Sequence, residues 1–191
     1  QQAGVAVESI GKLHYRSDED DTGFDRQQEA AHIAGPGQVW GSVRDPMPER
    51  DRGGAGLFAK IGAGESSYNR FDQRVADKAA QWITERATLP SAAPPAALFV
   101  GLVAPHFPLV VPQRYLDLYP LADLPWPKLR PETGAVRHPW VERQAAFNGL
   151  DGQLETEERK RLAIASYFAL VSFLDEQVGR ILDAIEASGQ G

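Results

Sequence analysis

The chain has 191 residues, of which 42% are apolar, and it carries a formal net charge of -6. These values are typical of one globular domain with a hydrophobic core. The acidic balance gives little support for nucleic-acid binding, and no apolar stretch approaches the roughly 20 residues of a membrane helix. Cysteine is absent, which excludes disulfides, thiolate zinc sites and a cysteine nucleophile among these residues. The compartment remains open.

The first predicted strand covers residues 4–12 (GVAVESIGK) and ends at a glycine. If the chain continues extended, Lys12 and His14 share a face, because alternate strand residues point the same way. A lysine and a histidine side by side suit an anion pocket, although the same pattern occurs on solvated strands.

An acidic, turn-rich loop is predicted over residues 17–27. Its Asp18, Asp20 and Asp21 could offer oxygen ligands to a cation, but they lack the spacing of a calcium loop. His32 and His138 have no partners at metal-ligand spacing, so we expect them to be surface or packing residues.

Glycine and proline recur over residues 34–69, which predicts a long irregular excursion. A helix is predicted over 70–87, with Asp72 as its cap and an apolar face formed by Val75, Ala79, Trp82 and Ile83. A continuous apolar run at 97–106 predicts a strand buried on both faces of a parallel sheet. Strand, helix and strand in this order indicate a βαβ crossover and an α/β fold.

The proline-rich segment that follows is predicted to be an ordered arm with one helical turn at QRYLDLY (113–119). Its Tyr115, Leu118, Tyr119 and Trp126 are too apolar to leave in water. A long helix is predicted over 155–189, capped by Thr156, ended at Gly189 and open to a break near Ser166. Its apolar stripe comprises Leu162, Tyr167, Leu170, Val171, Leu174, Val178, Ile181, Leu182 and Ile185.

One histidine follows the second predicted strand directly, at His106. Ligands of open α/β sheets collect at the carboxyl ends of the strands. If the two strands are parallel neighbours, Lys12, His14 and His106 converge on one rim. A point charge and two proton-exchanging imidazoles there would suit an oxyanion such as sulfate or phosphate.

Three segments resemble the sulfatases of the alkaline-phosphatase superfamily, in that family's order. GKLHY (11–15) is similar to its Gly-Lys-x-His segment, and residues 99–120 to its strand with Pro-His-x-Pro and an aromatic arm. Residues 166–189 are similar to the helix before its third block. The resemblance implies part of an alkaline-phosphatase-like sandwich, with a mostly parallel sheet and flanking helices. Residues 1–191 would then be the central part of a single catalytic domain.

The resemblance implies hydrolysis of a small-molecule sulfate ester through a formylglycine nucleophile and a divalent cation, usually calcium. Lys12 would match the lysine that contacts the sulfate and the nucleophile. His14 would match the histidine that orients the nucleophile, and His106 the one that hydrogen-bonds the ester or sulfate oxygen near the leaving group. Fixed donors at that oxygen would stabilise its developing charge.

The family's Cys/Ser-x-Pro-x-Arg motif and its aspartate metal blocks have no match in this sequence. We therefore expect an internal fragment that is inactive alone, with the metal ligands and the formylglycine elsewhere in the full-length protein. A phosphodiesterase or phosphonate monoester hydrolase of the same superfamily, or a non-catalytic anion-binding module, are the alternatives. Exposed sheet edges would favour a homo-oligomer.

Overall fold

The computed structural model describes residues 4–13, 15, 20–31, 45–47, 49 and 57–189. The chain divides into two compact units. The first unit comprises Gln1–Gly37, Ser66–Ala104 and Ser172–Gly191, and the second comprises Gln38–Glu65 and Pro105–Val171. His14, His32, Asp18 and the greater part of the 34–69 excursion lie outside the described residues.

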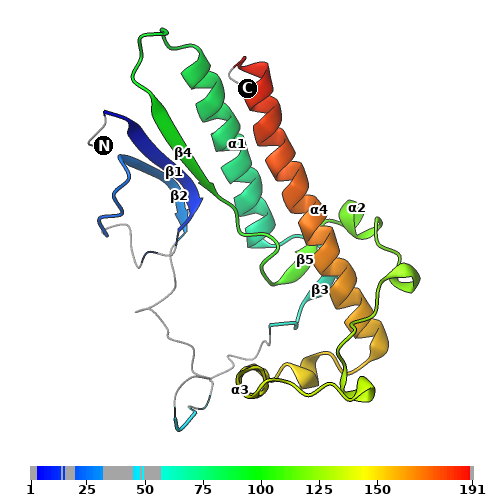
Figure 1. Ribbon diagram of the computed structural model, residues 1–191. Helices are drawn as coiled ribbons and strands as arrows, with labels where there is room; N and C mark the ends of the chain where they lie inside the picture. Colours follow the sequence, from blue (N-terminus) through cyan, green and yellow to red (C-terminus); the bar gives the residue numbers. More distant parts are fainter. Residues whose placement is uncertain are drawn as a thin grey trace. The chain divides into compact units, whose positions relative to one another are not determined.

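A parallel sheet of three strands forms the first unit (Figure 1). Strand β1 (Ala6–Lys12) lies in the centre, between β2 (Arg26–Ala31) and β4 (Ala96–Gly101). Both pairings are parallel, and the β1–β4 register runs from Ala6 opposite Ala96 to Gly11 opposite Gly101. The α/β class, the parallel sheet and the strand–helix–strand unit are confirmed.

Strand β2 was not predicted, because its sequence RQQEAA has no apolar alternation. A bulge lies where the β1–β2 register shifts between Ile10 and Lys12. There Glu29 adopts a positive φ of 48°, which a non-glycine residue rarely does. Its carboxylate pairs with Arg74 and Lys78 of the following helix, at 3.2 and 2.9 Å. Two cations on one carboxylate help to hold the bulge against this strain.

Helix α1 (Ser67–Ala87) begins three residues before the predicted start. Ser66 is the N-cap: its hydroxyl accepts from the Asn69 amide, and the Asn69 side chain accepts from the Ser66 amide. The prediction that Asp72 caps this helix is wrong, because Asp72 lies in the helix and is fully buried.

The core of the first unit forms where α1 packs on the sheet. Ile10, Val75 and Ala79 are fully buried at its centre. Partly buried side chains pack around them: Phe71, Trp82, Leu98, Val100, Leu102 and Ile181. The predicted apolar face of α1 is therefore confirmed, and it fixes the helix against the sheet.

Strand β4 ends at Gly101, earlier than predicted, and it is not buried on both faces. Its residues alternate in exposure, and Phe99 is 46% exposed. Helix α1 covers the face that carries Leu98 and Val100, whereas Phe99 meets the Phe24 ring at 6.3 Å. The continuous apolar run suggested two buried faces, but the described residues cover only one.

In the described part of the second unit, every element except the helix α4 (Glu157–Ala187) is short. Strands β3 (Ile61–Ala63) and β5 (Leu109–Val111) form a parallel pair. Its other described elements are α2 (Gln113–Leu116), η2 (Leu121–Asp123), η3 (Pro131–Thr133), α3 (Pro139–Asn148), η4 (Asp151–Gln153) and the first half of the long helix α4. The predicted helical turn in QRYLDLY is confirmed by α2.

The aromatic arm is ordered but only partly buried. Tyr115 is buried, Tyr119 packs on Phe168 at 5.7 Å between ring centroids, and the Trp126 ring contacts two guanidinium groups, those of Arg130 and Arg161. Leu118, in contrast, is 61% exposed, so the prediction that it packs is wrong. His138 was predicted to be a surface or packing residue; it is a surface residue, and its Nδ1 accepts from the Trp140 amide at the start of α3.

Helix α4 (Glu157–Ala187) is continuous, with no break at Ser166. The Thr156 hydroxyl accepts from the Arg159 amide, which confirms the predicted cap. Of the predicted stripe only Leu170 is fully buried, and the buried side of the helix also includes Phe173 and Gln177. Four predicted stripe residues are exposed instead: Tyr167, Val171, Val178 and Leu182. Within the described residues no helix combines the length and hydropathy needed to cross a bilayer.

Candidate functional site

The carboxyl ends of β1 and β4 approach each other closely at two glycines. Gly11 has φ +104°, and a Cβ there would lie 2.1 Å from the Gly101 carbonyl oxygen. A Cβ on Gly101 would lie 2.3 Å from the Lys12 carbonyl oxygen. Both positions therefore require glycine. This contact fixes the backbone of Lys12 against the end of β4.

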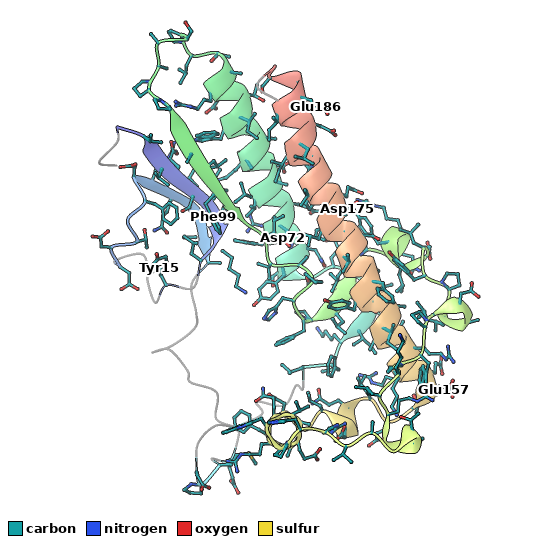
Figure 2. All side chains as sticks on the ribbon, in the orientation of Figure 1. Tyr15, Asp72, Phe99, Glu157, Asp175 and Glu186 are labelled. Carbon is teal, nitrogen blue, oxygen red and sulfur yellow. The ribbon has the colours of Figure 1, made fainter. Side chains whose placement is uncertain are left out.

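Asp72 reaches from α1 to the chain that leaves β4 (Figure 2). Its two carboxylate oxygens accept hydrogen bonds from the amides of Val103 at 2.7 Å and Ala104 at 2.8 Å. Burial raises the pKa of the Asp72 carboxyl above its ordinary value, against the opposing effects of the two amides and the Lys12 ammonium. The buried carboxylate thus holds the chain that leaves β4 against α1.

Sequence reasoning missed this role of Asp72, although a signal was present. Asp72 stands three positions before Val75 and seven before Ala79, on the apolar face of α1. A carboxylate on a buried helix face needs hydrogen-bond donors. The donors here are backbone amides, which residue types do not reveal.

The structure describes two of the three predicted site residues, Lys12 and His106. Lys12 is half-buried at the end of β1. His106 belongs to the second unit, where its side chain is exposed; its Nδ1 lies 2.6 Å from the Phe107 carbonyl oxygen. His14 is outside the described residues. Their convergence on one anion therefore stays a prediction.

The acidic loop uses its described carboxylates on its own backbone. Asp21 accepts from the Gly23 amide at 3.0 Å, and Asp25 accepts from the Val7 amide at 2.7 Å. In the part of the chain that the structure describes, no group of three or more acidic or histidine side chains could hold a metal ion.

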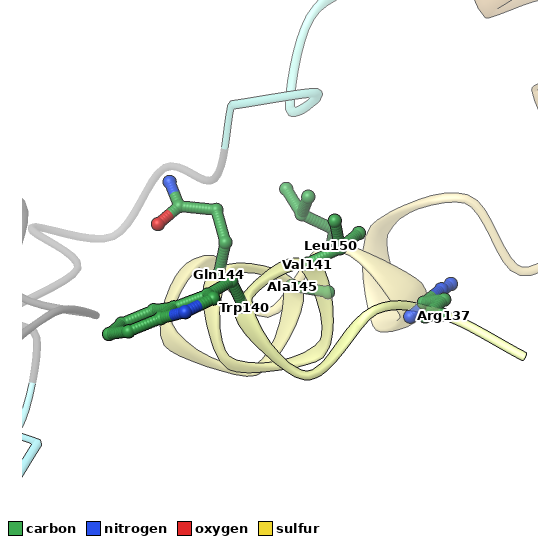
Figure 3. Close-up of a pocket in the computed structure, with 6 residues that line it drawn as sticks. All are labelled: Arg137, Trp140, Val141, Gln144, Ala145 and Leu150. Atoms are coloured by element: carbon green, nitrogen blue, oxygen red, sulfur yellow. The ribbon is translucent and has the colours of Figure 1, made fainter.

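Two cavities of the second unit are amphipathic. The smaller, of about 370 Å³, lies along α3 between Trp140, Val141, Leu150 and Arg137 (Figure 3). The larger, of about 1070 Å³, is lined by aromatic and charged side chains that include Trp126. Surfaces of this kind can take up organic groups, but neither cavity is lined by His106.

Comparison with known proteins gives one consistent result. A model of the sulfatase family matches residues 1–191. A sulfatase from Formosa agariphila is 28% identical over 141 residues, which cover 70% of this chain and 27% of that protein. A choline-sulfatase from Rhizobium meliloti is 26% identical over 194 residues, covering 97% of this chain and 37% of the relative. A human iduronate 2-sulfatase is 30% identical over 126 residues, covering 60% and 22%.

The chain therefore spans between about a fifth and two fifths of the length of these relatives. All three are sulfatases by name; the choline-sulfatase and the iduronate 2-sulfatase are named for different substrates, and the name of the Formosa agariphila protein specifies none.

Proposed function

Because this chain belongs to the sulfatase family of the alkaline-phosphatase superfamily, we propose that the full-length protein hydrolyses sulfate esters. The match over residues 1–191 carries this proposal. The closely paired ends of β1 and β4 support it, since parallel α/β sheets hold their ligands at that edge.

Each predicted site residue is proposed to act on the sulfate ester in its own way. The Lys12 ammonium would hold a sulfate oxygen as a point charge, and Gly11 explains how its backbone is fixed. His106 would donate a hydrogen bond near the leaving oxygen, where charge develops as the S–O bond breaks. His14 would orient the nucleophile.

The divalent cation and formylglycine are proposed from the family resemblance. The described residues contain no cluster suited to a metal ion, and we propose that groups of the full-length protein outside this chain hold the metal and the nucleophile. The cation would stabilise negative charge on the sulfate oxygens. Residues 1–191 are then the central part of a single catalytic domain.

The test compares the full-length protein with its Lys12→Met and His106→Ala variants. We expect hydrolysis of an aryl sulfate, with kcat/KM reduced by a factor of about 100 or more in either variant. Lys128→Met is the control, because it removes the charge of an exposed lysine that has no role in the proposed site. Preferential hydrolysis of an aryl phosphate would instead favour a phosphodiesterase or phosphonate monoester hydrolase. Full activity of both site variants would overturn the proposed roles.

A further inference from the structure

Asp72 does not stabilise its own helix in any evident way. The N-terminus of α1 is already capped by the reciprocal hydrogen bonds of Ser66 and Asn69. Asp72 is fully buried on the face that packs toward the sheet. A carboxylate in that position loses its hydration, so burial opposes its charged form. An apolar side chain there would avoid this penalty.

The carboxylate meets backbone amides where the sheet stops. The β1–β4 pairing ends at Gly11 opposite Gly101. Val103 and Ala104 follow Gly101 after Leu102, and Asp72 accepts hydrogen bonds from both amides. One side chain thereby fixes the path of the chain as it leaves β4.

The two proposed sulfate-binding groups of the described chain are connected to this arrangement in different ways, one through the sequence and one through charge. His106 follows Ala104 by two residues in the sequence. The Lys12 ammonium interacts with the Asp72 carboxylate electrostatically, and the Lys12 carbonyl packs against Gly101. A shift of the Val103–Ala104 backbone would therefore disturb the start of the segment that carries His106.

We propose that Asp72 is a positioning residue of the sulfatase site, which holds the Val103–Ala104 backbone and thereby fixes the course of the chain toward His106. The inference rests on the proposed function. It assigns Asp72 no contact with substrate. Asp72 would act by keeping the His106 donor accurately placed for the bond-breaking step. Its substitution should therefore change kcat more than KM.

The first measurement is hydrogen exchange of the unsubstituted full-length protein, followed by mass spectrometry with fragmentation across residues 102–106. We expect the Val103 and Ala104 amides to exchange slowly, because both are hydrogen-bonded to a buried carboxylate. Exchange of these amides at the rate of an unstructured peptide would overturn the proposal. This measurement needs no activity and no variant.

The second measurement compares Asp72→Asn with Asp77→Asn, an exposed aspartate of the same helix that pairs with Arg180. The asparagine is isosteric but presents one acceptor instead of two. We expect faster exchange at Val103 and Ala104, and a kcat reduced by a factor of about 10 to 100 with KM changed less than threefold. Asp77→Asn should leave the exchange of both amides, kcat and KM unchanged.

A folded Asp72→Asn protein with ordinary kcat would contradict the positioning role. So would a loss that appears entirely in KM. If the unsubstituted protein hydrolyses no sulfate ester, the proposed function fails, while the exchange data still decide whether Asp72 holds this backbone.

Discussion

The two compact units are stabilised in different ways. In the first, apolar side chains of α1 and the sheet bury one another around Ile10, Val75 and Ala79. The second unit also buries apolar side chains, among them Val111, Tyr115 and Leu170, but its irregular backbone is held in addition by long polar side chains. The Gln153 side chain accepts from the Phe58 amide across 95 residues of sequence, and the Arg159 guanidinium donates to the Phe58 carbonyl across 101 residues.

This difference has a consequence for how each unit tolerates change. A hydrophobic core distributes its stabilisation over many contacts. Hydrogen bonds to a loop backbone concentrate it in a few groups, and loss of one donor leaves a partly buried acceptor unpaired. The first unit should therefore respond most to changes of backbone shape, and the second to loss of single polar side chains.

The largest expected loss of stability follows from Gly11→Ala. The new Cβ would overlap the Gly101 carbonyl oxygen, and alanine is strained at φ +104°. We expect a loss of about 2–5 kcal/mol in the free energy of unfolding, from strain and overpacking together. Denaturant unfolding of the full-length protein measures it. Gly152→Ala in the second unit is the control, since nothing lies within 4 Å of its added Cβ; equal effects of the two changes would contradict the structure.

Sequence reasoning succeeded where apolar periodicity determines the structure. The helical face of Val75, Ala79 and Ile83 predicted α1, and the apolar run before His106 predicted β4. It failed where polar groups determine it. The sequence of β2 has no apolar alternation, and its bulge depends on ion pairs of Glu29 with α1.

The sequence likewise predicts one part of the candidate site and not another. Lys12 at the end of a strand follows from residue order and strand parity. The role of Asp72 does not, because its partners are amides that every residue except proline carries. Exposure of Leu118 and of Phe99 depends on what covers each face, and periodicity alone does not specify a covering element.

An intermediate effect is expected for Arg159→Met in the second unit. The guanidinium donates to the carbonyls of Gln153 and Phe58. Its removal leaves two partly buried acceptors without this donor, at a cost of about 1–3 kcal/mol. Hydrogen exchange over residues 57–63 should rise, while the amides of β1 stay protected. Lys128→Met, at an exposed position, is the control, and indistinguishable exchange in the two variants would show that Arg159 does not hold this segment.

The smallest expected effect is on the pH dependence of stability. Its sign should differ between Asp151 in the second unit and Asp72 in the first. The hydrogen bond with Arg137 lowers the pKa of the Asp151 carboxyl in the second unit, whereas burial raises the pKa of the Asp72 carboxyl in the first. Stability from Asp151 is therefore present above the ordinary aspartate pKa of about 3.9 and lost as the pH falls through its lower folded value. For Asp72 the folded state binds the proton more readily, so stability falls as the pH rises from that ordinary value through the higher folded pKa.

Asp151→Asn should consequently lower stability at pH 6 by at most about 1 kcal/mol, because the ion pair with Arg137 is largely exposed. The difference from the unsubstituted protein should shrink as the pH falls through the lowered folded pKa of Asp151, because the carboxylate is then protonated. Asp72→Asn should show the opposite trend: relative to the unsubstituted protein, its stability should improve as the pH rises through the folded pKa of Asp72, because the amide side chain never acquires the buried charge. Denaturant unfolding at a series of pH values measures both trends. Parallel pH dependences in the two variants would mean that the carboxylates share one kind of environment, and the contrast between a buried and a surface-paired acid would then be wrong.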